Sequence, residues 1–379
     1  MRVEEWRSEQ PGSWNDATVA QLNGAADLVL LFGSRTRLSS PDLLPTIQDR
    51  YPNAILTGCS TAGEISDTEV HDDSVSVVAV AFDHTRLRAC TEVIDEPKDS
   101  RVVGNRVAAA LAGQGLSHVF VLSEGLMVNG SELVAGITEA LPAHVGVTGG
   151  LAGDGALFGN TVVVDDHGVR GGVVRAVGFY GNRLRVGAAS HGGWDPFGPE
   201  RLITKADGNV LYELDHKPAL GVYKDYLGAY AAGLPATGLR FPLAIRDRSG
   251  GPTLVRTLLA VDEAAGTLTF AGDMPLGGNA RLMKANFDRL VDGSVRAAVE
   301  ARDKLPTHSV SLSILISCVG RKLVLKQRVE EELEGVREVF GDAPVLTGFY
   351  SYGEVCPPPL GGAAMLHNQT MTITSFAEV

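Results

Sequence analysis

Short apolar runs recur along the chain, and several stand on either side of a more polar segment. The first pair is "DLVLLFG" (27–33) and "NAILTG" (53–58), with "SPDLLPTIQDRY" (40–51) between them. Apolar runs of this length predict buried strands, and a proline near the start of the intervening segment is typical of a helix start. We therefore predict a strand, helix, strand unit, which "SVSVVAVAF" and "LRACTEV" extend by two further strands.

The same order begins again twice. "HVFVLSEG" (118–125) and "HVGVTGGLAGDG" (144–155) flank "SELVAGITEAL", and "SLSILISCVG" (311–320) and "PVLTGFYSYGEV" (344–355) flank "VEEELEGVREVFG". The spacing supports an internal repeat, because the small residue that ends each first strand precedes the threonine of the second strand by similar distances. These pairs are Gly33 and Thr57, Ser123 and Thr148, and Ser317 and Thr347.

A different region separates the second copy from the third. "LITKADGNVLYELDHKPALGVYKDYLG" predicts strands and a helix that opens at Pro218, and "LRFPLAIRD", "TLVRTLLAVD" and "GTLTFAGD" predict a meander of strands. We place a domain boundary here, with one domain over residues 16–215 and the other over residues 216–379. The predicted fold class is α/β, with two domains and mixed sheets with flanking helices, in an α/β/β/α-type layered sandwich built from repeated strand-helix-strand-strand-strand units.

Composition narrows the classes of partner. The chain has 379 residues, enough for two cores, and a formal net charge of −12 with scattered lysines and arginines. Such a surface lacks the basic stripe that nucleic-acid binding requires. The amino-terminal segment "MRVEEWRSEQPGSWND" lacks the apolar core of a signal peptide, and the apolar runs are shorter than the roughly 20 residues of a membrane span. We expect a cytoplasmic protein that binds neither nucleic acid nor membranes.

Two glycine-rich frames share one pattern, "GCSTAGEI" (58–65) and "GFYSYGEV" (348–355). Each keeps glycine at its first and sixth positions and then a glutamate, Glu64 or Glu354, and "GGLAGDG" places Asp154 at the related position of the middle copy. A strand that ends in small residues lets the main chain approach another group closely and leaves N–H groups free to donate. We predict that both frames wall one cleft, in which their main-chain amides hold a small molecule.

Several motifs in order resemble the FIST family, named for F-box and intracellular signal transduction proteins. They are "GCSTAGEI", "GGLAGDG", "VVVDDHGVRGGVV", "SHGGWDPFG", "ADGNVLYELDHKPAL", "SCVGR", "GFYSYGEV" and "LHNQT". The resemblance runs from about residue 25 to the end and covers the amino-terminal and carboxyl-terminal FIST domains. In place of the family's usual His-Gly-Trp, the chain has His191-Gly192-Gly193-Trp194.

The resemblance implies a sensory module that binds a small molecule, with amino acids or their derivatives as proposed ligands. It also implies that a subset of the family binds haem and senses nitric oxide. Since the resemblance fills the chain, we expect the signal to pass to a separate signalling protein such as a kinase or cyclase.

Each candidate side chain also has a purely structural interpretation, in which it binds no ligand. Cys59 and Cys318 are either nucleophiles or buried residues, and Glu64 and Glu354 either recognise a ligand or brace their own loops. Tyr350 and Tyr352 alternate along an extended chain and share one face there, either walling a pocket or packing in the core. The four cysteines, which include Cys90 and Cys356, show no CxxC spacing, so we expect reduced thiols.

His191 and Trp194 lie in a glycine- and proline-rich loop, where the imidazole is either a haem ligand or a hydrogen-bonded structural residue. Asn368 either anchors a ligand or caps a turn. No zinc-type ligand spacing or dinucleotide fingerprint is present, so we expect no metal and no cofactor, with haem as the alternative.

The leading hypothesis is a sensor that is not an enzyme and that holds its ligand between the two domains. The alternatives are a haem-based nitric oxide sensor and a cysteine-dependent hydrolase or transferase. The predicted ligand-binding residues are Cys59, Ser60, Thr61, Glu64, Asp154, His191, Trp194, Cys318, Arg321, Tyr350, Ser351, Tyr352, Glu354 and Asn368.

Overall fold

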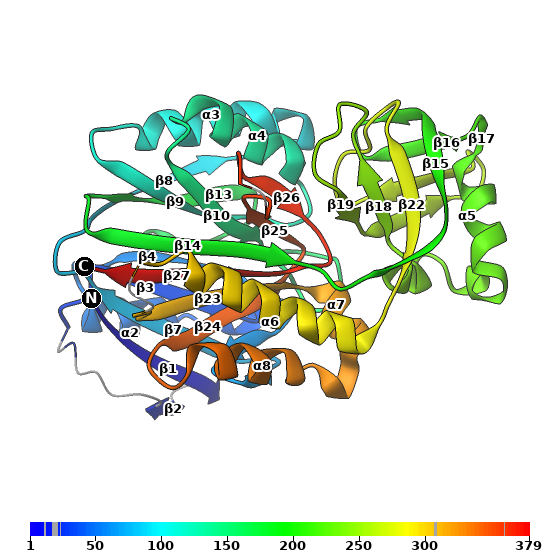
Figure 1. Ribbon diagram of the computed structural model, residues 1–379. Helices are drawn as coiled ribbons and strands as arrows, with labels where there is room; N and C mark the ends of the chain where they lie inside the picture. The colour runs from blue at the N-terminus through cyan, green and yellow to red at the C-terminus, as the bar shows by residue number, and fades with distance from the viewer. Residues whose placement is uncertain (11–12, 17–21, 23, 307–308, 360) are drawn as a thin grey trace.

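The computed structural model describes residues 1–10, 13–16, 22, 24–306, 309–359 and 361–379 of the chain. A large core contains three mixed sheets, and a β-rich part projects to one side of it (Figure 1). The two chain ends lie side by side on the core, where the amino group of Met1 is 3.4 Å from a carboxylate oxygen of Glu378.

The three core sheets share one strand order: a hairpin, then two parallel strands, then antiparallel strands. The first sheet runs β12 (Gly168–Arg170), β11 (Val163–Asp165), β4 (Ile55–Ser60), β3 (Leu28–Gly33), β7 (Val75–Ala81), β1 (Arg2–Gln10), β2 (Ser13–Asp16). The second runs β26 (Met365–His367), β25 (Gly353–Cys356), β10 (Gly146–Leu151), β9 (Leu116–Ser123), β13 (Val173–Tyr180), β8 (Arg86–Val93). The third runs β6 (Glu69–His71), β5 (Glu64–Ser66), β24 (Val345–Ser351), β23 (Leu312–Cys318), β27 (Met371–Glu378), β14 (Leu184–His191).

Each hairpin joins a different sheet from that of the strand that precedes it in the chain. The β5–β6 hairpin follows β4 in the chain but pairs with β24, and the β11–β12 hairpin follows β10 but pairs with β4. The β25–β26 hairpin follows β24 and pairs with β10, which closes the exchange among the three sheets. The central sheets therefore depend on one another for their strand pairing.

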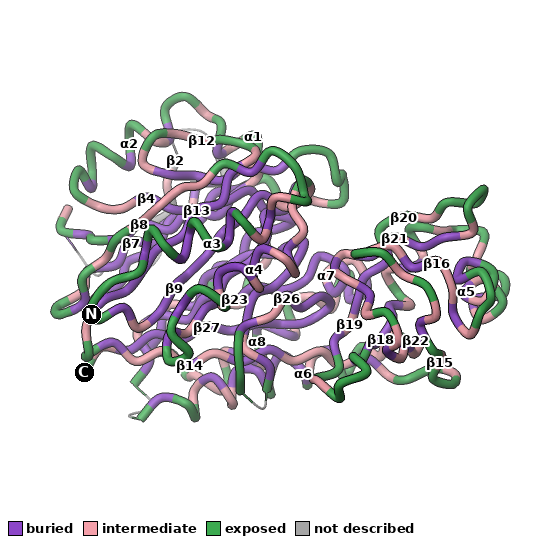
Figure 2. The backbone as a smooth tube through the Cα atoms, turned by 90° about the horizontal axis from the view of Figure 1, so that it is seen from above, coloured by how far each residue is buried: buried purple, intermediate pink, exposed green. Residues whose placement is uncertain are grey.

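The sheets pack their inner faces together. Phe32 of the first sheet lies 4.8 Å from Phe349 of the third, measured between ring centroids, and Phe179 of the second lies 5.5 Å from Phe376. All four rings are buried, as is most of the strand backbone around them (Figure 2). The predicted α/β class with mixed sheets and flanking helices is confirmed, and the core contains a third sheet in addition to the expected pair.

Helices cover the outer faces (Figure 1). Helices α3 (Ser100–Leu111) and α4 (Gly130–Ala140) pack over the second sheet, and α6 (Phe287–Asp303) and α8 (Glu331–Phe340) pack over the third. The remaining short core helices are α1 (Arg35–Leu38), α2 (Leu43–Arg50), η1 (Pro97–Asp99), α7 (Val319–Leu325) and η4 (Lys326–Arg328). Helix α6 buries the small side chains Ala297, Ala298 and Ala301, which bring it close to the sheet.

The projecting part is an insertion between β14 and α6. It contains β15 (Asp195–Asp207), β16 (Val210–Leu214), β17 (Lys217–Pro218), α5 (Ala219–Leu227), η2 (Gly228–Gly233), η3 (Ala236–Arg240), β18 (Leu243–Arg246), β19 (Leu254–Arg256), β20 (Leu258–Asp262), β21 (Thr267–Phe270) and β22 (Asn279–Lys284). It has its own core, with Tyr223, Leu268 and Phe270 fully buried. Asp215 lies in the turn between β16 and β17, and the domain boundary between residues 215 and 216 stays a prediction.

The glycine frames allow a close approach of neighbouring strands. Gly58, Gly149 and Gly348 occupy the same position in β4, β10 and β24, opposite the first parallel strand of each sheet. A Cβ at these positions would lie 2.1 Å from Leu31 O, 1.8 Å from Val121 O and 1.8 Å from Leu315 O, respectively. Only glycine fits there without moving the backbone.

We predict that Gly348→Ala lowers the free energy of unfolding by about 3 kcal/mol or more, because the new methyl group overlaps a backbone oxygen in a packed sheet. Chemical denaturation measures the change. Gly221→Ala is the control, since nothing lies within 4 Å of a Cβ there and the site is helical, so it should be neutral or stabilising. Equal stabilities of the two variants would contradict the steric argument.

Candidate functional site

The three glycine frames meet at the centre of the core and bond to one another through their main chains. The contacts are Ala62 N to Tyr350 O (2.8 Å), Gly153 N to Ser60 O (2.8 Å) and Tyr352 N to Leu151 O (3.3 Å). These amides donate within the protein, so the prediction that they are free to hold a metabolite is wrong at these positions. Their convergence itself agrees with the expectation that the frames at 58 and 348 lie close together.

Glu64 closes the first frame. Its carboxyl group accepts the hydroxyl of Thr61 over 2.5 Å and both the amide (3.1 Å) and the hydroxyl (2.7 Å) of Ser74. Burial raises the pKa of Glu64 to about 7, against the lowering effect of these hydrogen bonds. The side chain therefore ties the loop to the start of β7.

Glu354 plays the same part in the frame at 348–355. It accepts the hydroxyl of Ser351 over 2.8 Å and the amide (3.2 Å) and hydroxyl (2.8 Å) of Thr370. Burial raises the pKa of Glu354 to about 8. Both repeated glutamates thus form the same loop-bracing arrangement, which explains why the eight-residue frame occurs twice.

Asp154 holds the loop that follows β10. One carboxylate oxygen accepts the amides of Gly159 (2.9 Å) and Asn160 (2.8 Å), and the other accepts the hydroxyl of Tyr352. The loop that Asp154 holds carries Phe158, whose ring stacks on the ring of Tyr352 at a centroid distance of 4.5 Å.

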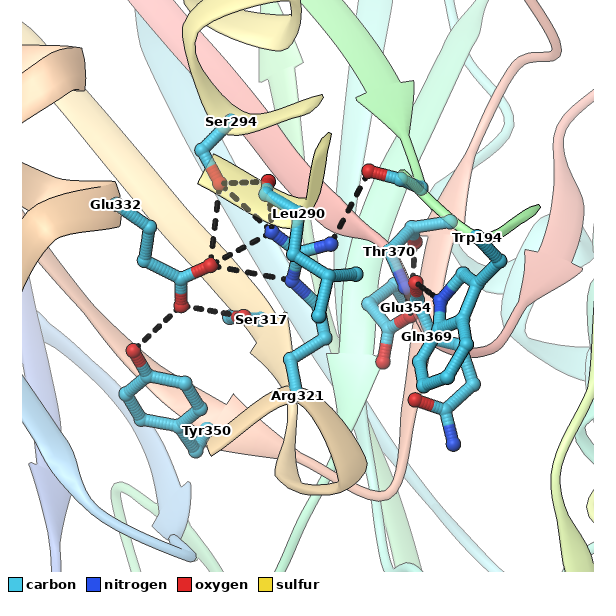
Figure 3. A network of polar contacts seen from close by, with 11 residues as sticks. Trp194, Leu290, Ser294, Ser317, Arg321, Glu332, Tyr350, Glu354, Gln369 and Thr370 are labelled. Carbon is cyan, nitrogen blue, oxygen red and sulfur yellow. Dashed lines mark hydrogen bonds and ion pairs between the residues drawn. The ribbon is translucent and has the colours of Figure 1, made fainter. Parts of the chain in front are cut away.

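Arg321 lies in a buried polar network (Figure 3). Its guanidinium pairs with Glu332 over 2.7 Å, and both side chains are fully buried. Glu332 also accepts the hydroxyl of Tyr350 over 2.6 Å, whereas Tyr352 bonds to Asp154. The two tyrosines therefore serve different networks, and Arg321 holds α8 and α6 against the third sheet.

His191 and Trp194 also have partners within the protein. Nε2 of His191 lies 2.6 Å from a carboxylate oxygen of Glu300 on α6. The indole N–H of Trp194 donates to Gln369 O over 2.9 Å (Figure 3). These contacts fasten the loop before the insertion to the core.

All four cysteines are free, and burial raises the pKa of each thiol. The values reach about 11 for Cys90 and about 12 for Cys318 and Cys356, and Cys59 is fully buried in the central core. A thiol with such a pKa is protonated at neutral pH and is a poor nucleophile.

A cavity of about 310 Å³ lies between the core and the insertion. Core residues on its wall include Gly125, Leu126, Asn129, Leu151, Cys318 and Tyr352. Insertion residues on its wall include Asn209, Leu239, Thr257, Leu259, Phe270 and Gly272. Most of these side chains are apolar, and aromatic rings from both parts face the same space, as is typical of small-molecule sites.

Two polar groups at this cavity differ in their bonding. Asn129 caps α4 by accepting the amide of Glu132 over 3.2 Å, and its amide group donates to Asp273 over 2.8 Å. The hydroxyl of Thr257 is buried and has no hydrogen-bond partner within the described part of the chain. A buried hydroxyl without a partner costs free energy, which a ligand at this wall would recover.

Asn368 lies in the loop between β26 and β27 and is 1% exposed. Neither its side-chain oxygen nor its nitrogen has a partner among the residues that the structure describes. Its predicted role in ligand binding stays a prediction.

Of the predicted residues, Cys318 and Tyr352 line the cavity, while the loop residues Ser60, Thr61, Ser351 and both glutamates lie in the centre of the core. The sequence reasoning missed Asn129, Phe158 and Thr257. Asn129 precedes "GSELVAGITEAL" as a helix cap does, which is a local signal. Nothing local marks Thr257, because the insertion brings it to the cavity.

Comparison with protein families matches a FIST N domain over residues 27–217 and a FIST C domain over residues 219–357. The chain belongs to the FIST family. FIST domains are associated with signal transduction and with the sensing of small ligands. The sequence-based identification is confirmed.

Relatives of this FIST protein are uncharacterized proteins. One from Mycobacterium tuberculosis is 24% identical over 369 residues, which covers 94% of this chain and 92% of that protein. One from Methanocaldococcus jannaschii is 25% identical over 353 residues and is longer, since the match covers 82% of this chain and 63% of that protein. A solved structure of cyanuric acid hydrolase from A. caulinodans aligns over 100% of this chain and 99% of its own, at 9% identity and a TM-score of 0.33, too low for an argument about fold or activity.

Across the described residues, no helix is long and apolar enough to cross a membrane. Nor do three or more His, Cys, Asp or Glu side chains there gather in a way that could hold a metal ion.

We predict that Glu354→Gln flattens the pH dependence of stability between pH 7 and 8. The glutamate keeps its proton up to about pH 8 in the folded protein, whereas in the unfolded chain it loses the proton near its ordinary pKa of 4.5, so the free energy of unfolding falls as pH rises through this range. One pH unit corresponds to about 1.4 kcal/mol for one such group. Denaturation at several pH values measures the slope.

The control for this experiment is Glu64→Gln. Burial raises the pKa of Glu64 to about 7, so above pH 7 the slope of stability against pH depends largely on Glu354. The buried histidines His118 and His367, whose pKa values burial lowers to about 3 and about 4, act in the opposite direction only below about pH 6.5. A Glu354→Gln profile as steep as that of the wild type would show that this carboxyl group is charged in the folded protein.

We also predict that all four cysteines alkylate slowly at pH 7.5 in the folded protein and quickly after unfolding in guanidinium chloride, because burial raises every thiol pKa. Iodoacetamide labelling followed by mass spectrometry measures each rate. A single cysteine that reacts in the folded protein as fast as a free thiol would revive the cysteine-dependent enzyme hypothesis.

Proposed function

We propose that this FIST protein is a sensor that binds a small molecule, such as an amino acid or a derivative of one, in the cavity between the core and the insertion. The observation that carries the proposal is this cavity of about 310 Å³, which lies within the size range of sites for small metabolites. Its walls are largely apolar, and the unpaired hydroxyl of Thr257 adds a polar contact that the protein itself does not use.

The position of the cavity suggests how binding is transmitted. Arg256 of the insertion donates to Leu366 O of the core over 3.0 Å, and Asn129 of the core donates to Asp273 of the insertion over 2.8 Å. A ligand that touches both parts adds further contacts across this boundary and stabilises one relative placement of the insertion. A separate signalling protein, such as a kinase or cyclase, then recognises that placement.

The other hypotheses have less support from the geometry. His191 bonds to Glu300 and is not among the residues of the cavity wall, so we do not propose it as a haem ligand. Cys318 does line the cavity, but burial raises its pKa to about 12, and Glu354 is occupied by Ser351 and Thr370. Neither residue is arranged as a nucleophile or a free acid–base group.

The proposal predicts that a metabolite raises the melting temperature and that Leu259→Trp abolishes this effect. Leu259 lines the cavity and is 43% exposed, so the larger ring can fill the cavity mouth without entering a packed core. A ligand present at 100 times its Kd stabilises the folded state by about 2.7 kcal/mol. Thermal-shift assays with amino acids, organic acids, amines and nucleobases measure the effect.

Leu276→Trp is the matched control, because Leu276 lies in the insertion, is 64% exposed and is not part of the cavity wall. It should respond to the metabolite as the wild type does. The sensor proposal is refuted if no compound stabilises the wild type, or if Leu259→Trp responds as fully as Leu276→Trp.

A further inference from the structure

Arg256 is a buried cation that forms no close ion pair among the described residues, although the charges of Asp273 and Glu354 act on it from farther away. It is 3% exposed, and its guanidinium donates to two main-chain oxygens, Asp273 O at 3.3 Å and Leu366 O at 3.0 Å. No carboxylate forms an ion pair with it in the part of the chain that the structure describes. The other deeply buried arginine of the core–insertion region, Arg321, pairs with Glu332 over 2.7 Å. Burying a charge without a close ion pair costs free energy, so a negative group beside Arg256 would stabilise the folded protein.

The guanidinium of Arg256 lies directly behind the cavity wall at Gly272. A Cβ built on Gly272 would be 2.8 Å from Nε and 2.9 Å from Cζ of Arg256, and 3.1 Å from the hydroxyl oxygen of Ser131. Gly272 lines the cavity, and Ser131 lies in the first turn of α4. The positive charge and the amino-terminal end of the helix therefore meet at one side of the cavity.

Helix α4 adds to the positive potential there. It has 11 residues, and its amino-terminal end lines the cavity with Asn129, Gly130 and Glu132. The first amides of a helix have no acceptor within the helix, and the helix dipole is positive at this end. Asn129 satisfies the amide of Glu132, which leaves the amides of Gly130 and Ser131 as the donors of this turn.

Thr257 provides an independent sign of a ligand. It follows Arg256 in the chain, lines the same cavity and is 5% exposed. Its hydroxyl group has no hydrogen-bond partner in the described structure. A donor of this kind at a cavity wall is satisfied when a ligand oxygen enters.

The acidic groups around the cavity already have partners. Glu132 pairs with Arg101 over 2.7 Å, and Lys98, on the cavity wall, pairs with Glu96 over 2.5 Å. The carboxylate of Asp273 accepts the side-chain amide of Asn129 and keeps its charge, which acts on Arg256 from beyond ion-pair distance. Glu354 is held by hydroxyl groups, and burial keeps its pKa at about 8, so it is largely uncharged at pH 7. Among the described residues around the cavity, Arg256 therefore has the charge of Asp273 in its neighbourhood but no carboxylate that forms an ion pair with it.

We infer that the cavity binds the carboxylate group of a small monoacid with an apolar body. This rests on the proposed sensor function and deepens it. The carboxylate lies against the amides of the first turn of α4 and the hydroxyl of Thr257, with the charge of Arg256 behind Gly272. The apolar body lies along the stacked rings of Phe158 and Tyr352 and the leucines opposite them.

Three isosteric probes test the charge of the ligand: 3-phenylpropionate, 3-phenylpropanamide and 3-phenylpropylamine. Thermal shift and calorimetric titration of the full chain should show binding of the acid and at least tenfold weaker binding of the amide and the amine, because a hydrogen bond to a charged group contributes about 1.5–3 kcal/mol. Stronger binding of the amine or the amide than of the acid would overturn the inference.

Two variants locate the carboxylate. Thr257→Val keeps the shape of the side chain and removes only the unpaired hydroxyl, so it should fold at least as stably as the wild type and bind the acid about tenfold more weakly. Arg256→Met should lose at least as much affinity, and Arg256→Lys should retain part of it. If Arg256→Met does not fold, Thr257→Val and Arg256→Lys carry the test.

Arg175→Met is the matched control. Arg175 is 4% exposed, pairs with Asp166 over 2.6 Å and is not part of the cavity wall. This variant should lose stability and keep its affinity for the acid. Unchanged affinity of both Thr257→Val and Arg256→Lys for the acid would overturn the inference.

The metabolite screen separates this inference from the proposed function. If the compounds that stabilise the wild type are amines or neutral molecules, and Leu259→Trp abolishes their effect, the sensor function stands and the carboxylate inference fails. If no compound of any class stabilises the protein, both fail. Hits confined to monoacids support both.

Discussion

The mutual hydrogen bonding of the three glycine frames holds the core together. Each frame ends a parallel strand, and its main chain forms hydrogen bonds with a neighbouring frame. The amide of Ala62 donates to Tyr350 O, and the amide of Gly153 donates to Ser60 O. Within each sheet, glycine at positions 58, 149 and 348 lets the second parallel strand lie close to the first. The exchange of hairpins among the sheets follows from the same geometry, because the chain leaves each frame already beside another sheet.

Because the main-chain groups of the frames bond to one another, the candidate binding site lies elsewhere, at the boundary between the core and the insertion. The glutamates of the repeated frames brace loops through hydroxyl and amide donors, and Arg321 is satisfied by Glu332. Among the described residues, a buried hydroxyl without a partner lies instead where the insertion meets the core, at Thr257, next in the chain to Arg256, whose guanidinium donates to main-chain oxygens. A ligand at this boundary contacts both parts, so its binding can favour one relative placement of the insertion.

The buried ionisable groups divide into two kinds with different consequences. Arg321 and Glu332 neutralise each other inside the core, so their charges contribute to packing and orientation without a ligand. Glu64 and Glu354 lower the free-energy cost of burying a carboxylate by keeping a proton near neutral pH. Arg256 donates to main-chain oxygens and forms no ion pair with a carboxylate in the described part of the chain, which is why we infer that an anion binds beside it.

The sequence by itself determined the local elements, the family and the repeated frame, because strand and helix periods, glycine positions and cap residues are short-range signals. It also placed Glu64 and Glu354 as equivalent residues. Only the tertiary structure decided that the frames bond to each other, since their amides could equally well have faced a cleft. The cavity was likewise beyond the sequence, because its wall combines Asn129, Thr257, Cys318 and Tyr352, which come together only when the insertion folds back on the core. Whether a buried side chain has a partner depends on such distant neighbours, and no local pattern encodes them.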